Sequence, residues 1–579
     1  REALMAVRVW APNAKRVELE TGGQHSAMTE TGGGWWQAQT ELPVGADYAF
    51  CLDGGPPRPD PRSHYQPRGI HGPSRIIDHS TFKWDDARWQ PPPLPSAVVY
   101  ELHVGTYTPE ATFEAVIDKL PHLVRLGVTH VELMPVHEFP GKRGWGYDSV
   151  DIYAAHHGYG GPEGLKRLVA ACHRAGLAVL IDVVYNHLGP AGNYLEEFGP
   201  YFSERHFTPW GKAVNFDGPR SDEVRRFFID NALMWLRDYH ADGLRLDAIH
   251  AIVDTSAIPF LEQLATEVAA LSAHLGRHLV LIAESDLNDP RVVRNREVGG
   301  FGYDAQWNDD FHHALHTVLT GERDGYYADF GTISDLATAL RQSFVYAGRY
   351  SAFRRRQHGQ AIRGLSGHRF LGYLQNHDQT GNRARGDRGS HLMSRGRLKI
   401  GAALVLTSPF VPMLFQGEEW GATSPFQFFT DFEEPELARA VREGRRREFV
   451  AFGWSPEAIP DPQDPGTFEN SKLKWDELHA PPHSELLDWH KKLIALRRRE
   501  SALTDGRLEK VGVDFDEQAR WLVVERGVIT VACNLADRRQ LVPIGPHRPR
   551  SLRLASEPQI EIQESGIELP PDAVAILGD

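Results

Sequence analysis

Residues 162–187 read PEGLKRLVAACHRAGLAVLIDVVYNH, and this stretch decides the class of fold. Residues 162–175 have the apolar spacing of a helix, whereas the apolar run Leu177–Val184 after Gly176 is typical of a buried strand. A helix that leads directly into a buried strand is the repeating unit of a parallel sheet.

The same alternation extends in both directions along the chain. Further apolar runs lie at Val98–Val104, His130–Pro135, His278–Ala283, Phe370–Gln375 and Val411–Phe415. Further segments with helical spacing lie at Phe113–Leu126, Ser221–Tyr239, Ala257–Leu275 and Gly396–Leu406. Roughly eight strand–helix units in one chain favour a closed (β/α)8 TIM barrel over an open sheet. We therefore predict an α/β protein with a barrel over residues 94–502.

We expect a domain on each side of the barrel and an insertion within it. Residues 1–93 show short alternating runs between glycine-rich turns, which predicts an N-terminal β-sandwich of the carbohydrate-module or immunoglobulin-like kind. A proline-rich linker, Trp89–Ser96, follows it. Residues 301–368 do not fit one strand–helix unit, so we expect an inserted helical subdomain there. After an amphipathic helix at Ser484–Arg499, short apolar runs predict a C-terminal β domain over residues 503–579.

The composition excludes several classes of protein. The chain of 579 residues is 41% hydrophobic and 24% charged, which excludes a mostly disordered protein. Its net charge is −14 and its basic runs are short, so no nucleic-acid partner is expected. We interpret those basic runs as solvated faces or local ion pairs: Arg354–Arg356, Arg445–Arg447 and Arg497–Arg499.

Neither a membrane partner nor a disulfide framework is expected. The longest apolar stretch, Ile400–Phe415, contains two prolines and is shorter than the about 18–20 residues that a membrane span needs. Three cysteines are too few for a disulfide framework, and the first residues lack the apolar core of a signal peptide. These features favour a reducing, cytoplasmic location.

Polar residues end several of the expected barrel strands. The reactive groups of barrel enzymes lie at the carboxyl ends of the strands, so these residues are the first candidates for a site. They are Asp182 and His187, Arg245 and Asp247, Glu284, and His377 and Asp378.

Two of the carboxylates have unequal surroundings. Arg245 and Asp247 share one face of a strand, and the Arg keeps the carboxylate ionised, as a nucleophile requires. Glu284 emerges from an apolar run, which raises the pKa of a carboxyl group and suits a general acid. Two such carboxylates are what glycoside hydrolysis requires. Structural alternatives stay open: a buried ion pair, a helix cap and a polar turn.

Aromatic residues near other strand ends offer flat apolar faces for sugar rings. These are Trp145, Tyr147, Tyr159, Trp307 and Trp420. A metal site at His377 and Asp378 is disfavoured because adjacent residues lack the spacing of helical ligands.

The four strand-end segments together resemble the signature segments of the α-amylase family of glycoside hydrolases. They are Asp182–His187, Gly243–Asp247, Ala283–Glu284 and Asn376–Asp378, in that order. The resemblance implies that Asp247 is the nucleophile of a retaining mechanism, Glu284 the general acid and base, and Asp378 a stabiliser of the transition state. It implies no cofactor and no metal. It also implies sugar-binding or orienting roles for Tyr147, Asp148, His187, Arg245 and His377.

Other segments are similar to the members of this family that release trehalose. They are Asp60–Pro67, His71–Ser74, Ala283–Pro290, Gln416–Gly421 and Pro425–Phe429. The likeness implies a maltooligosyltrehalose substrate, cut at the α-1,4 bond next to its terminal trehalose, with trehalose as a product. It implies a place in trehalose biosynthesis from starch- or glycogen-type glucans, coupled to a maltooligosyltrehalose synthase.

The trehalose unit has to occupy the leaving-group side of the site. We expect it to meet residues that follow the acid, lie in the insertion or follow the fourth segment: Asp286, Trp307, Asp310, Gln379, Asn382 and Arg383. His250 stands three residues after the nucleophile, where many α-amylases have Lys, so an α-amylase-like substrate preference is in doubt.

Two other functions stay open. A 1,4-α-glucan branching enzyme has the same barrel and carboxylates but transfers to a sugar, and Ser285–Pro290 and Phe426–Phe429 favour hydrolysis instead. An inactive amylase-like glycan-binding protein would typically have lost the catalytic carboxylates, and here all three are present together with Arg245.

Overall fold

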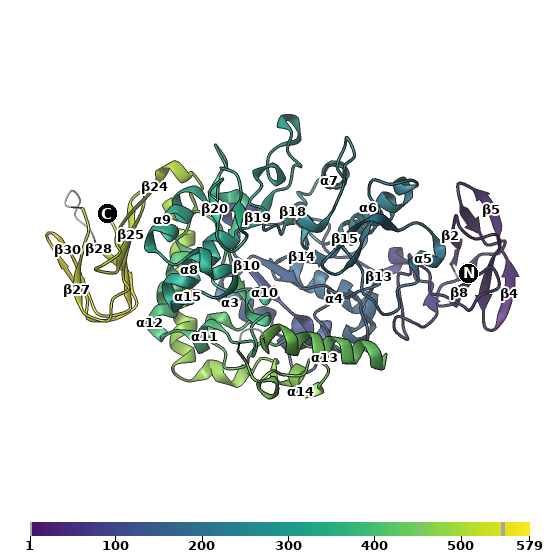
Figure 1. Ribbon diagram of the computed structural model, residues 1–579. Coiled ribbons are helices and arrows are strands. Elements are labelled where there is room, and N and C mark those ends of the chain that lie inside the picture. The colour runs from purple at the N-terminus through teal and green to yellow at the C-terminus, as the bar shows by residue number, and fades with distance from the viewer. Residues whose placement is uncertain (1–2, 451–452, 546–550) are drawn as a thin grey trace.

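A closed barrel of eight parallel strands lies at the centre of the molecule (Figure 1). The structure is a computed structural model that describes residues 3–450, 453–545 and 551–579. Around the barrel the strands are β10 (Val99–Leu102), β11 (His130–Leu133), β14 (Ala178–Val183), β17 (Gly243–Leu246), β18 (Val280–Ala283), β19 (Ala305–Trp307), β22 (Phe370–Gly372) and β23 (Val411–Phe415). Strand β23 pairs with β10 and closes the barrel, which confirms the predicted (β/α)8 fold.

Alternate residues of each strand point into the barrel. Leu180, Ile282 and Met413 belong to an inner apolar cluster. Leu244 and Leu246 belong to the outer core, between the strands and the surrounding helices. Because side chains two residues apart share a face, Asp182 points inward like Leu180, and Arg245 lies opposite it in register. The inner face therefore carries an ion pair beneath the carboxyl ends of the strands.

Helices cover the outside of the barrel. The long ones are α4 (Gly161–Arg174), α6 (Ser221–Arg237), α7 (Phe260–Leu275), α12 (Arg395–Leu406), α13 (Pro435–Val450) and α15 (His483–Arg499). The short ones are α1 (Val104–Tyr107), α2 (Phe113–Ile117), α3 (Leu120–Leu126), α5 (Leu195–Phe198), α10 (His377–Gly381), α11 (Gly389–Leu392) and α14 (Pro465–Asn470). Phe113–Leu126 is therefore not one helix, because Pro121 cannot donate to the carbonyl of Ile117.

The segment 301–368 contains a barrel strand that the sequence analysis missed. Strand β19 pairs with β18 on one side and β22 on the other, and the helical part begins only after it. That part comprises α8 (Asp309–Thr320), α9 (Ile333–Gln342) and a hairpin of β20 (Tyr350–Ser351) and β21 (Arg356–Gln357). A three-residue strand is too short to show a recognisable apolar run.

Two small antiparallel sheets lie in the segments that follow the second and third barrel strands. Strands β12 (His137–Glu138) and β13 (Asp151–Ala155) pair with each other after the second barrel strand, as do β15 (Phe202–Thr208) and β16 (Gly211–Val214) after the third.

The N-terminal region consists of small antiparallel sheets at one end of the molecule (Figure 1). The sheets are β2 (Arg8–Trp10) with β6 (Trp35–Gln37) and β5 (Thr29–Gly32); β4 (Gln24–Ala27) with β3 (Val17–Thr21), β8 (Asp47–Leu52) and β9 (Ser74–Arg75); and β1 (Leu4–Met5) with β7 (Leu42–Pro43). Arg58 forms a bidentate ion pair with Glu197: its Nε atom donates to Oε2 at 2.9 Å and its Nη2 atom to Oε1 at 2.8 Å. This pair joins the N-terminal region to the barrel domain. The linker is also anchored, since Nε1 of Trp89 donates to Asp242 at 2.8 Å.

The C-terminal region lies at the opposite end and is also β (Figure 1). One sheet contains β24 (Val511–Asp516), β25 (Trp521–Arg526), β26 (Ile529–Asn534), β31 (Ala573–Gly578) and β28 (Ser551–Ala555); the other contains β27 (Gln540–Pro543), β30 (Gly566–Leu569) and β29 (Glu561–Gln563). The domain limits at residues 93/94 and 502/503 stay a prediction.

The three cysteines are free and buried: Cys51, Cys172 and Cys533. Among the described residues, no helix is both long and apolar enough to cross a membrane.

Candidate active site

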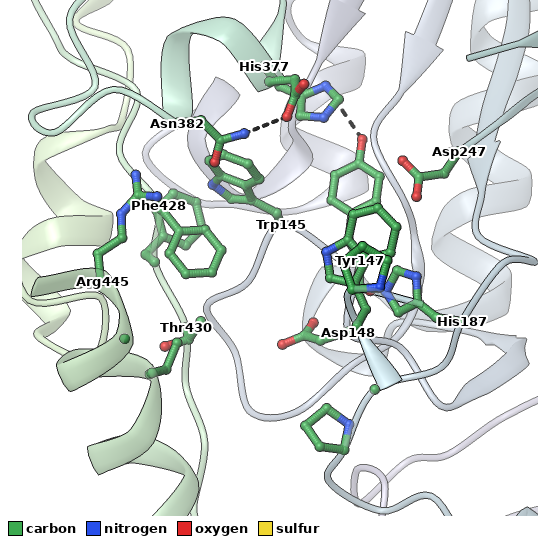
Figure 2. Close-up of a pocket in the computed structure, with 18 of the residues that line it drawn as sticks. Trp145, Tyr147, Asp148, His187, Asp247, His377, Asn382, Phe428, Thr430 and Arg445 are labelled. Carbon is green, nitrogen blue, oxygen red and sulfur yellow. Dashed lines mark hydrogen bonds between the residues drawn. The ribbon is translucent and has the colours of Figure 1, made fainter. Parts of the chain in front are cut away.

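A pocket of about 710 Å³ opens at the carboxyl ends of the barrel strands (Figure 2). The three predicted catalytic carboxylates line it: Asp247, Glu284 and Asp378. They follow β17, β18 and β22, of which β17 and β18 are neighbours in the barrel and β19 separates β18 from β22. Aromatic side chains line much of the remaining wall, namely Trp145, Tyr147, Trp210, Phe428, Phe429 and Phe432.

The fully buried guanidinium of Arg245 holds the carboxylates together. Its Nη1 atom donates to both oxygens of Asp182, each at 2.9 Å, and to Oδ1 of Asp247 at 3.0 Å. Its Nη2 atom lies 2.9 Å from Oε2 of Glu284. The predicted contact between Arg245 and Asp247 is therefore present, and the same cation also reaches Glu284.

The pKa values of Asp247 and Glu284 are moved in opposite directions. Burial by itself raises the pKa of Asp247, but Arg245, the ring of His187 and a hydrogen bond from Asn186 outweigh it and hold the pKa below its usual value. Burial raises the pKa of Glu284 well above its usual value, and the neighbouring charges of Asp247 and Asp378 raise it further against the opposing effect of Arg245. One carboxyl group is therefore suited to stay ionised and the other to carry a proton.

The backbone after Asp247 takes part in this arrangement. Ala248 has φ 36° and ψ 53°, a left-handed conformation that residues with a Cβ atom rarely adopt. In this conformation the N–H of Ala248 donates to Oε2 of Glu284 at 2.8 Å. The strained residue thus fixes the position of the proposed acid relative to β17.

His377 and Asp378 are the first two residues of one short helix, α10, and both line the pocket. Asn376 caps this helix by accepting from the N–H of Asp378 at 3.0 Å. The ring of His377 lies 2.9 Å from Glu101 inside the barrel and 4.9 Å from the ring of Tyr147, on which it stacks. Burial lowers the pKa of His377, but the charge of Glu101 more than compensates and raises it.

Most of the other sugar-binding residues predicted around the cut line the pocket. Tyr147 donates to Asp182 at 2.6 Å, and Asp148 has a carboxylate oxygen without a hydrogen-bond partner in the part of the chain that the structure describes. Burial raises the pKa of Asp148 to about 6. Both ring nitrogens of His187 already contact protein acceptors, Oδ1 of Asn186 at 2.5 Å and the carbonyl of Tyr147 at 2.7 Å. His187 can therefore bind a sugar hydroxyl only by exchanging one of these partners.

Three of the residues predicted to meet the leaving group, Asp286, Gln379 and Asn382, lie at or near the carboxylates, together with His250. Asn382 is exposed in the pocket and donates to Asp378. Gln379 is buried and donates to Asp309 at 3.2 Å. His250 lies 3.8 Å from Asp286, which is 45% exposed. These positions are compatible with contact to a substrate, and the contact itself stays a prediction.

Three residues of the same prediction do not point into the pocket. Trp307 is inside the barrel, 1% exposed, with its ring 4.0 Å from the guanidinium of Arg245. Asp310 is buried and accepts from the backbone N–H groups of residues 345 and 346 at 2.8 and 2.9 Å, so it holds a loop. Arg383 turns away and pairs with both carboxylate oxygens of Glu322. Packing, hydrogen bonds or ion pairs occupy these three side chains in this structure, and their contact with a substrate stays a prediction.

The sequence analysis missed Asp309, which lies closer to the site than its neighbour Asp310. It accepts hydrogen bonds from Tyr373 and Gln379. Burial raises the pKa of Asp309 to about 7, and the charge of Asp378 contributes to the rise. Asp309 lies two residues after the end of β19, and a carboxylate at the end of a barrel strand is a candidate site residue. It was not predicted because this short strand was not recognised in the sequence.

Two further lining residues had no clear signal in the sequence. Trp210, in the turn between β15 and β16, is 51% exposed and stacks on His187 with ring centres 5.1 Å apart. Arg445 belongs to a basic run that we interpreted as a solvated face or local ion pairs; it is only 9% exposed and forms an ion pair with Glu448 at 3.3 Å. The interpretation is wrong for Arg497, which is buried and donates to main-chain carbonyls.

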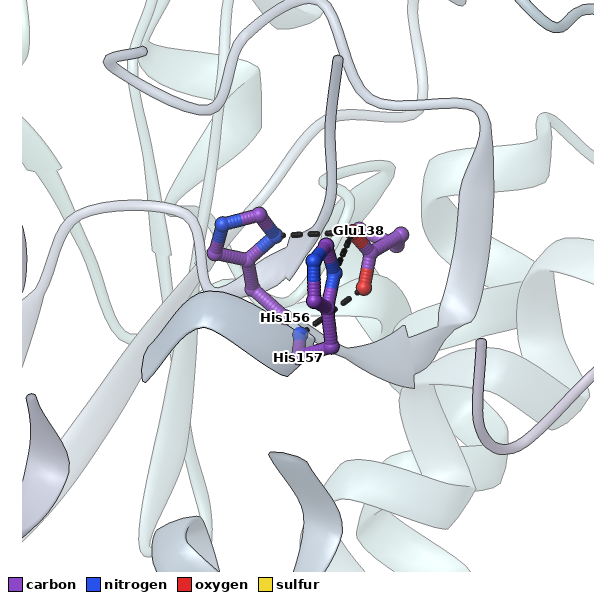
Figure 3. Close-up of side chains that lie close together, drawn as sticks. All are labelled: Glu138, His156 and His157. Atoms are coloured by element: carbon purple, nitrogen blue, oxygen red, sulfur yellow. Dashed lines mark hydrogen bonds and ion pairs between the residues drawn. The ribbon is translucent and has the colours of Figure 1, made fainter. Parts of the chain in front are cut away.

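One cluster outside the pocket has the residue types of a metal site (Figure 3). Oε1 of Glu138 lies 2.9 Å from Nδ1 of His156 and 2.7 Å from Nδ1 of His157, and Oε2 accepts from the backbone N–H of His157. Two ligands of a tetrahedral zinc ion lie about 3.3 Å apart, given metal–ligand distances of about 2.0–2.1 Å. The observed distances are those of hydrogen bonds, and three donors satisfy the carboxylate.

Comparison with known proteins agrees with this description of the barrel and its site. Residues 104–217 match the family described as alpha amylase, catalytic domain, and residues 506–576 match a domain of unknown function, DUF3459. A crystal structure of a candidate alpha amylase from Salmonella typhimurium has a TM-score of 0.91 and 37% identity, covering 99% of this chain and 97% of that one. The fold and the site thus define a glycosidase of the α-amylase class.

Similar sequences narrow the class further. The malto-oligosyltrehalose trehalohydrolase of Mycobacterium tuberculosis (strain CDC 1551 / Oshkosh) is 50% identical over 98% of both chains. That of Rhizobium sp. (strain M-11) is 48% identical over 99% of this chain and 97% of its own. A 1,4-alpha-glucan branching enzyme of Bacillus caldolyticus is 32% identical over only 58% of this chain. The chain belongs to the malto-oligosyltrehalose trehalohydrolase family.

Proposed function

We propose that this protein hydrolyses the α-1,4-glucosidic bond next to the terminal trehalose of a maltooligosyltrehalose and releases trehalose and a maltooligosaccharide. The observation that carries the proposal is the convergence of Asp247, Glu284 and Asp378 on Arg245 and one pocket. Full-length similarity to trehalohydrolases supports the choice of substrate.

The opposite pKa displacements of the two carboxyl groups support a two-step retaining mechanism. Asp247, held ionised, attacks the anomeric carbon while Glu284 gives its proton to the oxygen of the departing trehalose. The bond to trehalose breaks as the bond to Asp247 forms. Glu284, now ionised, takes a proton from water, and the resulting hydroxide displaces Asp247 from the glycosyl-enzyme. The side chains of the protein supply every group that these steps need.

The aromatic wall supports a binding site for the glucan arm of the substrate. Tyr147, stacked on His377, lies beside Asp247, and the pocket extends from there to Phe428 and helix α13 (Figure 2). Flat aromatic faces suit the apolar faces of sugar rings. We place the maltooligosaccharide in this part of the pocket and the trehalose on the side of Asp286 and Asp309. Asp378 then stabilises the transition state through the sugar hydroxyls.

The proposed reaction implies a cellular context. A maltooligosyltrehalose has to be made from a glucan by another enzyme, so functional coupling to a maltooligosyltrehalose synthase is part of the proposal. We also propose a cytoplasmic location, which the three buried free thiols support.

Incubation with maltotriosyltrehalose, followed by chromatography of the products, tests the proposal. We expect equal amounts of free trehalose and maltotriose, and much slower cleavage of maltopentaose, which has the same number of glucose units. New α-1,6 bonds in amylose without release of trehalose would assign the protein to the branching enzymes instead. No turnover of any α-glucan by the folded protein would contradict both the proposed hydrolysis and the branching activity.

A further inference from the structure

Helix α13 lies over the pocket and contributes one buried cation to it. Arg445 lines the pocket with a side chain that is 8% exposed, whereas its neighbours Arg446 and Arg447 are exposed. Burying a guanidinium is costly unless its N–H groups find acceptors, so the partners of Arg445 indicate what it does.

The main partners of Arg445 are two main-chain carbonyls, one at the last residue of α10 and one just after the helix. Its Nη2 atom donates to the carbonyl of Gly381 at 2.8 Å and to that of Arg383 at 3.3 Å. Its Nη1 atom donates to Glu448 at 3.3 Å, and its guanidinium lies 5.2 Å from the ring centre of Phe428. Arg445 thus holds the carbonyls of the residues on both sides of Asn382.

Asn382 in turn contacts a catalytic carboxylate. Its Nδ2 atom donates to Oδ1 of Asp378 at 2.5 Å. The loop is confined from another direction by Trp145, because a Cβ atom on Gly381 would lie 2.1 Å from the Trp145 ring. The peptide before Asn382 is therefore held between an indole ring and a guanidinium.

We infer that Arg445 is a positioning residue for the reaction: by fixing the carbonyls of residues 381 and 383 it aims Asn382 at Asp378 and so orients that carboxylate toward the sugar. Asp378 acts through directional hydrogen bonds, and a misplacement of about 1 Å can cost about 10²-fold in rate. Helix α13 is thereby part of the catalytic arrangement and not only a wall of the pocket. The inference rests on the proposed function because it assigns Asp378 a catalytic role.

A double-mutant cycle tests the inference. The variants are Arg445→Ala, Asn382→Ala, the double variant, Arg445→Lys and, as a matched control, Arg447→Ala on the exposed side of the same helix. The readouts are kcat and KM for maltotriosyltrehalose and the melting temperature. We expect each single alanine variant to lower kcat about 10- to 100-fold with KM within about threefold. The kcat of the double variant should lie within about threefold of the kcat of the worse single variant, because both substitutions break the same chain of contacts.

Several results would overturn the inference. Losses that multiply in the double variant would show that Arg445 and Asn382 act independently. A rise in KM without a loss of kcat would make Arg445 a sugar ligand, and equal losses in Arg447→Ala would show a general effect of the helix. If Arg445→Ala does not fold, the same cycle is run with Arg445→Lys, which retains one donor and should recover part of kcat.

A second substrate separates this inference from the proposed function. The cycle is repeated on 4-nitrophenyl α-maltotrioside, whose cleavage needs the carboxylates but no trehalose. Coupling on the aryl substrate without release of trehalose from maltotriosyltrehalose would reject the proposed substrate and keep the role of Arg445. Release of trehalose from maltotriosyltrehalose, with no coupling between Arg445 and Asn382 on either substrate, would support the proposed substrate and reject the role of Arg445.

Discussion

Nη1 of Arg245 lies 3.0 Å from Oδ1 of Asp247. The side chain of Arg245 is 0% exposed, so water does not weaken this ion pair. A cation that cannot be solvated interacts strongly with an adjacent carboxylate. Asp182 on the neighbouring strand shares the same guanidinium, which keeps the cation itself in place. The fold thus prepares an ionised Asp247 before any substrate binds.

Replacement of the proposed nucleophile should abolish activity without unfolding the protein. We expect Asp247→Asn to lower kcat on maltotriosyltrehalose by at least about 10³-fold, as for other residues that act covalently. Its melting temperature should stay within a few degrees of the parent, because Asp182 and Glu284 still pair with the buried Arg245 when Asp247 is neutral. Activity within about tenfold of the parent in the folded variant would exclude Asp247 as nucleophile.

Replacement of the proposed acid should change the pH dependence as well as the rate. Glu284 must be protonated to act as an acid, and its raised pKa lets activity persist above the pH at which an ordinary Glu ionises. Activity of the parent should therefore fall on the alkaline side as Glu284 loses its proton. Glu284→Gln should cost about 10²–10⁴-fold and remove this alkaline limb. The loss should be smaller on 4-nitrophenyl α-maltotrioside, whose leaving group needs no proton, and an equal loss on both substrates would contradict the role.

Asp309, on the proposed leaving-group side, should affect the pKa of the proposed acid, Glu284. The negative charge of Asp309 raises the pKa of Glu284, so removing that charge makes Glu284 easier to ionise. In Asp309→Asn the alkaline limb of the kcat/KM profile should move to lower pH. The matched control is Asp222→Asn, an exposed position in the first turn of α6, which should leave the profile unchanged. A shift to higher pH would show that the charge of Asp309 does not act on Glu284.

The stereochemistry of the product tests the mechanism independently of the substrate. Attack by Asp247 followed by attack of water inverts the anomeric carbon twice, so the new reducing end should be the α-anomer. Proton NMR of the fresh product, read before mutarotation, measures this directly. An initial β-anomer signal would mean a single inversion and would reject both carboxylate roles.

A buried histidine at the base of the barrel should make the stability depend on pH. Nδ1 of His173 lies 2.8 Å from Asp86, which precedes the linker, and Nε2 lies 2.9 Å from Asp242. Burial lowers the pKa of His173, but these two carboxylates outweigh it and the pKa is raised. The stabilisation is therefore fully present below about pH 6.5, the value for an unfolded His, and is lost as the pH rises through the folded pKa.

The variant His173→Gln measures this effect. It should lower the first thermal transition strongly at pH 6, where breaking a buried ion pair costs about 3–5 kcal/mol, and less at pH 9. His274→Gln, at an exposed position of α7, is the control and should show no such trend. A difference between His173→Gln and the parent that grows with pH would contradict the assignment of the charged form.

The sequence by itself determined the barrel and the identity of its main polar residues. Strands such as Leu177–Val184 are long apolar runs with a polar end, so both their burial and their reactive end are visible in the pattern. The shared face of Arg245 and Asp247 follows from the two-residue period of a strand, which holds whatever the tertiary structure.

Tertiary structure alone decided how deep each side chain lies and which partner it meets. Trp307 and Asp309 are two residues apart, yet one fills the barrel beside Arg245 and the other reaches the site, because Trp307 ends β19 whereas Asp309 begins α8. Arg445 and Arg447 are indistinguishable as members of a basic run. Only the packing of α13 on residues 381–383 buries the first and leaves the second in water, since desolvation depends on neighbours that come from distant parts of the chain.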